Sequence, residues 1–315
     1  NNTLIGGLAG DAITTGSNNV ALGHDSLGLN TTGDSNTAIG EDALQANTTA
    51  SNNVAVGRRA MFANTTGTDN VAMGHNALDA NTTASNNTAI GHDALTENTT
   101  GTRNTAVGNT ALTTNTTGNY NTAVGSHSLF YNTTASNNTA TGYLALHKTT
   151  TGANNTAVGL SALEENTTGA DNTAVGSASL DANTTGAENT SVGKSSLTGN
   201  TTGDFNTAVG ENALANNTTA DNNTAIGRRA LLANTTGASN TAVGALSLDA
   251  CTTGNSNVAV GINSLTSTQT GSNSVAVGNG ALSSQLGSGN MFNVAIGPDA
   301  GAAITTGVNN TLIGG

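Results

Sequence analysis

Histidines are the first residues of this chain whose types and spacing could do chemistry. His24, His75 and His92 each follow a glycine that closes a recurring Ala-Val-Gly-like phrase, and Asp93 follows His92. Imidazole and carboxylate groups bind zinc, but the recognised sites use three or four converging ligands. We therefore interpret these histidines as solvated surface residues, and we expect no metal and no cofactor.

Aromatic side chains gather in one stretch, SHSLFYNTTASNNTATGYLALHKTTTG, at residues 126–152. Exposed aromatic residues on a polar surface favour a binding patch for a cell-surface glycan or a protein receptor. The alternatives are drift in unconstrained turns and packing against a neighbouring chain. The candidate patch consists of Phe130, Tyr131, Tyr143 and His147.

Asparagine offers a third kind of site, because Asn-Thr-Thr is a recurring glycosylation sequon. If Asn47, Asn64 and Asn81 form an internal stack, they cannot carry sugar. The better candidate acceptors occupy a variable position within Asn-Asn-Thr: Asn86, Asn137 and Asn222.

The amino-acid composition excludes several classes of function, whereas these candidate residues only suggest some. The chain has 315 residues with 2% aromatic, 8% charged and no tryptophan, too few large side chains for ordinary globular cores. Its net charge is −12 and it has only seven Lys and Arg, so the chain is not expected to bind the phosphate backbone of nucleic acid. No stretch has the roughly 18 apolar residues of a membrane span. No nucleophile is paired with a base and a third partner, so we predict that the chain is not an enzyme.

One phrase repeats along the chain and must position every candidate residue. The closing glycine recurs every 17 residues from Gly6 to Gly278, then after 19 residues at Gly297 and after 17 more at Gly314. We number positions within a repeat from this glycine, position 0. Leucine then recurs at position 4, and asparagine at positions 7 and 13, whereas positions 1, 2, 5, 11 and 12 vary and carry nearly all the charge. The predicted structural columns include Gly40, Gly57, Gly74, Gly91, Leu44, Leu78, Leu95, Asn47, Asn64, Asn81, Asn98, Asn53, Asn70, Asn87 and Asn104.

A period of 17 residues is too short for helical repeats. The phrases NTAVG and NVAVG are typical of short strands, and NTTG is typical of a turn. The sequence therefore predicts an all-β, parallel β-solenoid, with one 17-residue turn per repeat and about 4.8 Å between turns. Buried asparagines at positions 7 and 13 are expected to form ladders at the corners. Cys251 occupies position 7, so we expect it to be buried and unreactive.

Two further features of the repeat concern the surface. Alanine at position 15 lies between two larger residues, so we expect it to point outward and to form a flat face for association with other chains. Glu41 and Asp42 precede Arg58 and Arg59 by one repeat, which predicts pairs of opposite charge on neighbouring turns.

The expected organisation is a single repeat solenoid over residues 1–315, with about 18 turns. A two-residue insertion falls in the turn at 279–297. The turns at 1–22 and 297–315 are atypical, because glycine replaces the leucine and Ile13 or Ile304 replaces the asparagine. Such turns either cap a solenoid or mark transitions to other segments of a longer fibre, and we favour the second interpretation.

Two segments carry a family resemblance. NNVAVGRRAM at 52–61 and SNSVAVGNGALSSQ at 272–285 resemble the head repeats of trimeric autotransporter adhesins, which form left-handed parallel β-rolls in trimers. The longer phrase NTAVGxxALxxNTTGxxN is similar to the shaft repeats of bacterial and viral tail-fibre proteins. The resemblance implies a homotrimeric fibre outside the cell, on a cell surface or a virion appendage. The adhesin heads use a shorter period, which leaves the cross-section of this chain open.

We therefore expect a structural or adhesive extracellular fibre segment without catalysis. Two alternatives stay open, an ice-binding β-solenoid and the subunit of a self-assembling extracellular filament. Ice-binding solenoids usually present Thr-x-Thr ranks, and none recurs here.

Overall fold

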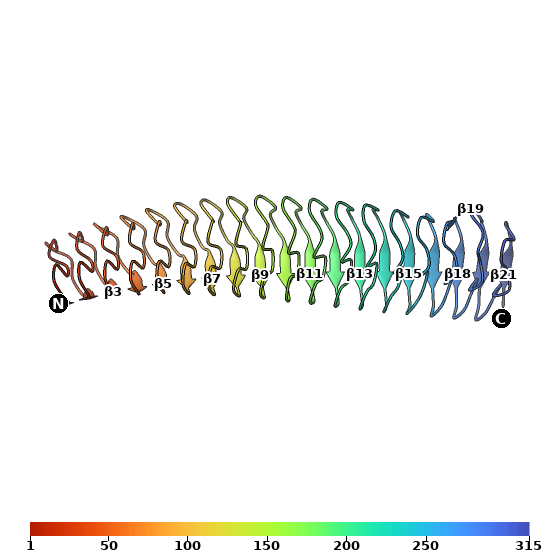
Figure 1. Ribbon diagram of the computed structural model, residues 1–315, viewed down its shortest axis with the longest axis horizontal. Helices are drawn as coiled ribbons and strands as arrows, with labels where there is room; N and C mark the ends of the chain where they lie inside the picture. The colour runs from red at the N-terminus through yellow and green to blue at the C-terminus, as the bar shows by residue number, and fades with distance from the viewer. Residues whose placement is uncertain (315) are drawn as a thin grey trace. The chain divides into compact units, whose positions relative to one another are not determined.

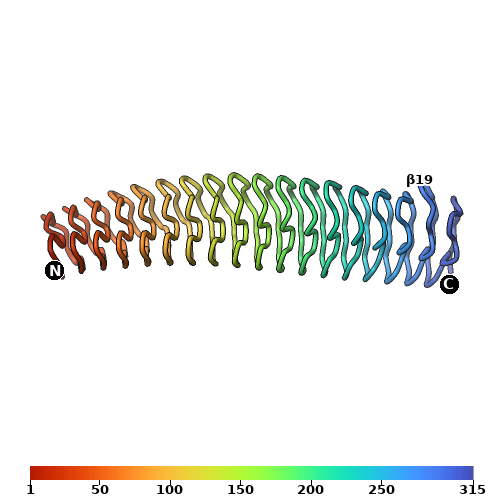
Figure 2. Tube along the Cα trace, in the orientation of Figure 1, coloured from red at the N-terminus to blue at the C-terminus, as the bar shows by residue number. Residues whose placement is uncertain are grey.

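The computed structural model describes residues 1–314, and these form an all-β, parallel β-solenoid with 17-residue turns and no helix. The chain divides into two compact units, Asn1–Asn154 and Asn155–Gly315. Figures 1 and 2 show the same coil repeated within each unit.

Within each unit, each turn contributes one strand of three residues, at positions 14 to 16, and the strands of neighbouring turns pair in parallel. In the first unit, Thr37, Ala38 and Ile39 lie opposite Val54, Ala55 and Val56, a register of one whole repeat. The strands of this unit are β1 (Thr3–Ile5), β2 (Val20–Leu22), β3 (Thr37–Ile39), β4 (Val54–Val56), β5 (Val71–Met73), β6 (Thr88–Ile90), β7 (Thr105–Val107), β8 (Thr122–Val124) and β9 (Thr139–Thr141).

The second unit continues the same pattern with one irregularity. Its strands are β10 (Thr156–Val158), β11 (Thr173–Val175), β12 (Thr190–Val192), β13 (Thr207–Val209), β14 (Thr224–Ile226), β15 (Thr241–Val243), β16 (Val258–Val260), β17 (Gly271–Ser272), β18 (Val275–Val277), β19 (Gly289–Asn290), β20 (Val294–Ile296) and β21 (Thr311–Ile313). The two-residue insertion lengthens the connection between β18 and β20, and there β19 pairs with β17 as a small additional sheet. The buried side chain of Met291 follows β19.

The alanines at position 15 point inward, contrary to the sequence prediction. Ala38, Ala55 and Ala72 are fully buried, whereas the residues on either side of them in β3, β4 and β5 are partly exposed. The core of each turn is narrow, and the leucine at position 4 already fills much of it, so only a methyl group fits under the strand. The larger β-branched residues at positions 14 and 16 therefore face outward, and we call these two columns the strand face.

The buried leucines adopt an unusual backbone conformation that the sequence pattern did not reveal. Leu44, Leu78 and Leu95 are fully buried with φ angles of 52°, 57° and 54°. A left-handed conformation costs a residue other than glycine about 1–2 kcal/mol. Burying a leucine side chain contributes about 1.5–3 kcal/mol, so packing offsets the conformational cost.

In the atypical turns at the two ends, glycine replaces the large leucine at position 4, and larger residues stand at positions 7 and 15. A Cβ atom added at Gly10 would lie 2.8 Å from Leu4 Cδ2 and 2.9 Å from Ile13 Cδ1. Leu4 stands where other turns have alanine, and Ile13 stands where they have asparagine. These two side chains thus occupy the space that the position-4 leucine fills elsewhere. Gly301, Ile304 and Leu312 repeat the exchange in the second unit.

Only part of the predicted charge pairing between neighbouring turns is present. Arg58 Nε lies 3.3 Å from Glu41 Oε2, as the repeat predicts. The prediction was wrong for Arg59, which pairs with Asp79 at 3.0 Å instead of with Asp42. The guanidinium of Arg59 also lies over the ring of Phe62 in its own turn, 4.2 Å from the ring centroid. The long side chain thus extends across its own turn to reach the carboxylate of the next turn.

Candidate functional site

The asparagines at position 7 form interior ladders of side chains wherever successive turns carry asparagine there. Asn47 Nδ2 donates to Asn30 Oδ1 at 2.8 Å and to the Ala50 carbonyl, three residues further along the chain, at 3.0 Å. Asn64 makes the same two bonds, to Asn47 Oδ1 and the Gly67 carbonyl. Each amide therefore joins two turns and also closes a corner of its own turn.

The asparagines at position 13 use their side chains differently. Asn36 Nδ2 donates to the Ala50 carbonyl at 2.9 Å, and Asn36 Oδ1 accepts the backbone N–H of Asn53 at 3.0 Å. The carbonyl at position 10 thus accepts hydrogen bonds from both asparagine columns. The eight asparagines that we selected as ladder residues are at most 1% exposed: Asn47, Asn64, Asn81, Asn98, Asn53, Asn70, Asn87 and Asn104.

This burial separates the two groups of sequons. Asn47, Asn64 and Asn81 have no accessible side chain in the folded protein. The other candidates are exposed, and all lie at position 12 with φ angles between 61° and 63°, a conformation that asparagine tolerates well. These accessible candidates are Asn86, Asn137 and Asn222.

The position-7 ladder contains two unsatisfied acceptors, and both precede an interruption of the asparagine column. Asn132 Oδ1 and Asn234 Oδ1 are buried without a hydrogen-bond partner. The residues one repeat further on are Thr149 and Cys251, neither of which is asparagine. The Cys251 side chain is fully buried, and its Sγ lies 3.6 Å from the Gly254 carbonyl. Burial raises the pKa of this thiol from its ordinary value of 9.0 to about 11.

We predict that Cys251 makes the stability of the second unit depend on pH in the alkaline range. Because the folded pKa is raised, the contribution is fully present below pH 9 and is lost as the pH rises from 9 to about 11. A change of two pKa units corresponds to about 2–3 kcal/mol. The measurement is urea unfolding of the wild type and Cys251→Ser at pH 8 and pH 10.5. The wild type should lose more stability than the variant, and equal losses would contradict the prediction.

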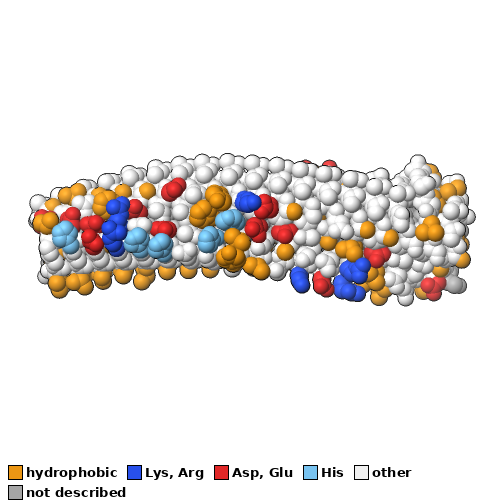
Figure 3. Space-filling model, in the orientation of Figure 1, with side chains coloured by type: hydrophobic (Ala, Val, Ile, Leu, Met, Phe, Trp, Pro, Cys, Tyr) orange, Lys and Arg blue, Asp and Glu red, His pale blue; other side chains and the backbone are white. Residues whose placement is uncertain are grey.

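An aromatic cluster lies on the surface of the first unit and includes all four residues of the candidate binding patch. Its members are His127, Phe130, Tyr131, Tyr143 and His147. The Phe130 ring stacks against His127 with centroids 5.9 Å apart and meets Tyr131 edge-on at 4.7 Å. His147 lies 5.2 Å from Tyr131 and 5.6 Å from Phe130. Figure 3 shows hydrophobic and histidine side chains gathered in such a patch.

The same cluster has both hydrogen-bonded and exposed groups. His127 Nδ1 lies 2.7 Å from Ser126 Oγ, and His147 Nδ1 lies 3.0 Å from the His127 carbonyl. These contacts hold both imidazoles in place. Tyr131 and Tyr143 remain 47% and 51% exposed. The arrangement is a fixed platform of aromatic rings that can stack against a flat, partly apolar ligand.

The histidines at position 1 are also brought together where the repeat places them on successive turns. His75 and His92 stack with ring centroids 5.1 Å apart, and Asp93 lies beside them. Sequence reasoning identified this group but could not determine how its carboxylate and ring nitrogens are arranged. His24 has no histidine one repeat before or after it.

Residues 1–314 form no pocket, so a ligand of this part of the chain would lie on an open surface. The described residues contain no helix of the length and apolarity that crossing a membrane requires. A scan against protein-family models and a search of curated proteins gave no match to the sequence.

Proposed function

We propose that this chain is a segment of an extracellular structural fibre, on a cell surface or a virion appendage, without a catalytic role. The main support is the repetition of a single turn, with glycine, leucine and two asparagines recurring in equivalent contacts. A chain built in this way uses its buried residues to stack turns. Each added turn extends the solenoid by about 4.8 Å, so the repeat number sets the length.

The strand face is the surface through which we propose that copies associate, as a homotrimer. Its columns contain no charged residue in the described turns, and large apolar side chains there are partly exposed, among them Leu22, Ile90 and Val124. Hydrophobic side chains also line an edge of the first unit in Figure 3. Because the columns repeat with each turn, a second copy in register presents a matching column along its whole length. The resemblance to trimeric adhesin heads favours three copies.

We assign any adhesive contact to the aromatic cluster. The chain has only four Phe and three Tyr, and three of these seven residues are in this cluster. Stacked rings with exposed tyrosine hydroxyl groups suit a glycan or a protein loop, because both present apolar surface beside hydrogen-bonding groups. The variable positions of the turns can carry such a surface without altering the core.

The assembly is tested by the mass of the particle in solution. Light scattering on a size-exclusion column is expected to give an elongated species of three times 30.7 kDa. A monomer would contradict the trimer, and if it also showed thermal hysteresis, the ice-binding alternative would replace the fibre. Particles of indefinite length would indicate the filament subunit instead.

A matched pair of variants tests the interface. Ile90→Lys combined with Val124→Lys places two charges on the strand face and is expected to dissociate the trimer. Thr100→Lys combined with Thr117→Lys makes the same change of charge at exposed residues of position 9. This control should remain trimeric, and dissociation of both variants alike would exclude a specific role of the strand face.

A further inference from the structure

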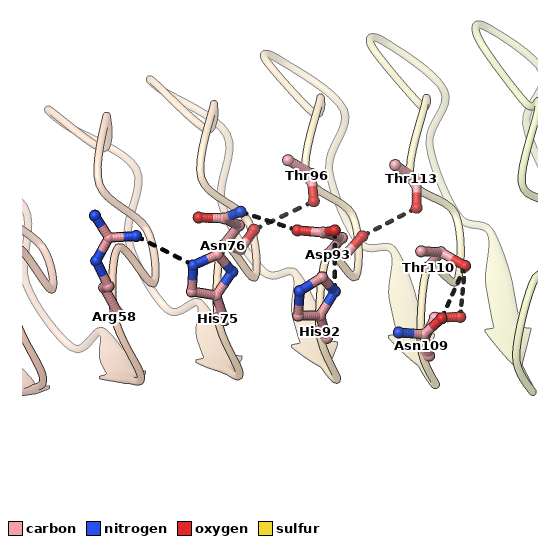
Figure 4. A network of polar contacts seen from close by, with 9 residues as sticks. All are labelled: Arg58, His75, Asn76, His92, Asp93, Thr96, Asn109, Thr110 and Thr113. Atoms are coloured by element: carbon pink, nitrogen blue, oxygen red, sulfur yellow. Dashed lines mark hydrogen bonds and ion pairs between the residues drawn. The ribbon is translucent and has the colours of Figure 1, made fainter.

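Two successive turns of the first unit place a pair of imidazoles in contact. His75 follows Gly74 and His92 follows Gly91, so both occupy position 1, and the in-register pairing of β5 with β6 aligns them. Their rings are nearly parallel, with an interplanar angle of 13° and centroids 5.1 Å apart. Figure 4 shows the two rings side by side with Asp93 next to them.

The carboxylate of Asp93 is held against this pair. Its Oδ2 lies 2.9 Å from His92 Nδ1, and its Oδ1 accepts a hydrogen bond from Asn76 Nδ2 at 3.0 Å. His75, His92 and Asp93 each offer a ligand atom, and these three atoms lie within 4.8 Å of one another. Two imidazole nitrogens and one carboxylate oxygen form a donor set that suits borderline divalent transition metals.

A buried nitrogen atom of His75 is an independent observation that points to a ligand at this cluster. His75 Nδ1 is buried without a hydrogen-bond partner. Arg58 Nη1 lies 3.3 Å from His75 Nε2, and because arginine can only donate, Nε2 must be the acceptor. A neutral His75 ring therefore carries its proton on Nδ1, where that proton has no acceptor.

We propose that His75, His92 and Asp93 bind one divalent transition-metal ion, such as Zn²⁺, that bridges two turns of the solenoid. Zinc–nitrogen bonds of about 2.0–2.1 Å place two ligand atoms of one ion about 3.3 Å apart. His92 Nδ1 and Asp93 Oδ2 are already within that distance, so the ring of His75 must tilt toward them. The His92 side chain is 55% exposed and has room to move. Three protein ligands leave at least one coordination position for water.

Arg58 opposes this binding in two ways. Its charge repels a cation, and its hydrogen bond keeps the ring proton of His75 on Nδ1, so metal binding at that atom requires the proton to move to Nε2 and Arg58 to withdraw. Arg58 is itself 54% exposed and paired with Glu41, which provides an alternative partner. The proposal therefore includes the expectation that Arg58→Gln strengthens metal binding.

Isothermal titration calorimetry of the full chain with ZnCl₂ tests the site, and the variant His24→Gln provides a matched control. We expect one high-affinity equivalent per chain, an affinity at least tenfold lower in His75→Gln and in His92→Gln, and a higher affinity in Arg58→Gln. His24 also occupies position 1 and is followed by Asp25, but no second imidazole lies one repeat away. His24→Gln should therefore leave the affinity unchanged.

The second histidine pair of the chain provides a further control. The ring centroids of His127 and His147 lie 6.1 Å apart, and the two rings are tilted relative to each other. The Nδ1 atoms of both rings already have hydrogen-bond partners. The double variant His127→Gln and His147→Gln should keep the high-affinity equivalent. The proposal is overturned if the wild type binds no zinc, or if His24→Gln or the double variant weakens binding as much as His75→Gln does.

Discussion

Replacing Gly176 by alanine is expected to lower the free energy of local opening of its turn by about 3–5 kcal/mol. Gly176 is at position 0 with φ of 137°, a region that residues with a side chain rarely adopt. An added Cβ atom would also lie 2.5 Å from the carbonyl oxygen and 2.6 Å from the carbonyl carbon of Gly193, the equivalent glycine of the next turn. Hydrogen exchange of the peptides covering residues 170–200, followed by mass spectrometry, measures this local opening.

Gly186→Ala is the control within the same turn, and we expect an effect of about 1 kcal/mol or less. A Cβ atom at Gly186, position 10, would also meet a backbone oxygen at 2.5 Å, that of Gly203. However, Gly186 does not have a positive φ, and the chain itself carries alanine at this position in Ala220, between turns that have glycine there. Equal loss of protection in both variants would mean that crowding between turns, and not the φ angle, makes glycine necessary at position 0.

Asn64→Ala is expected to destabilise the turns around it by about 2–4 kcal/mol. The variant removes the donor to Asn47 Oδ1, which is fully buried, and the acceptor of the bond from Asn81 Nδ2 at 2.9 Å. A buried acceptor left without a partner costs about 1–3 kcal/mol, and the lost volume adds to this cost. Protection from hydrogen exchange should fall in the turns that contain Asn47 and Asn81.

Asn109→Ala is the matched control for that variant, because Asn109 is exposed at position 1. Its side-chain oxygen accepts one bond from Thr110 Oγ1 at 3.4 Å, near the limit for a hydrogen bond. We expect a change within about 0.5 kcal/mol. If Asn64→Ala were equally mild, the amide ladder would contribute little beyond filling space.

The sequence predicted the fold because turns can stack in register only if each turn has the same number of residues, and this number is the period of the repeat. The glycine at position 0 recurs at the interval that returns the chain to the same point of the coil, so counting residues gives the register of β3 on β4. The burial of Asn47 and Asn53 was predicted in a similar way, because a polar side chain that recurs in most turns can bond to its own counterpart in the next turn.

The side on which the strand residues lie could not be obtained from the period. Alternation requires only that Ala55 and Val56 point in opposite directions, and hydrophobicity favours valine for the interior. The space left by Leu44 and Met61 decides the matter in favour of alanine. That space depends on the left-handed backbone conformation at the leucine position. Leucine usually avoids this conformation, so a leucine in the sequence does not indicate it.

The candidate metal site was only partly visible in the sequence. The interval between His75 and His92 predicts that the two imidazoles lie on neighbouring turns. It does not predict that Asn76 directs the Asp93 carboxylate toward them, or that Arg58 leaves Nδ1 of His75 buried without an acceptor. These details depend on the orientation of side chains at positions 1 and 2, where the residue type changes from turn to turn.

The in-register ladder has a consequence for how the gene of such a chain can change. The regular turns present the same bonding edge to both neighbours, so gaining or losing a whole regular repeat by unequal recombination leaves each remaining contact intact. Gaining or losing a single residue displaces glycine from position 0, and the Cβ of its substitute would meet the backbone of the adjoining turn. The turn with two extra residues is accommodated by an additional strand pair and by the longer Gln285, whose amide reaches Ser274 and Asn293. Length can therefore evolve in whole steps of one turn, and departures from that step require local reconstruction.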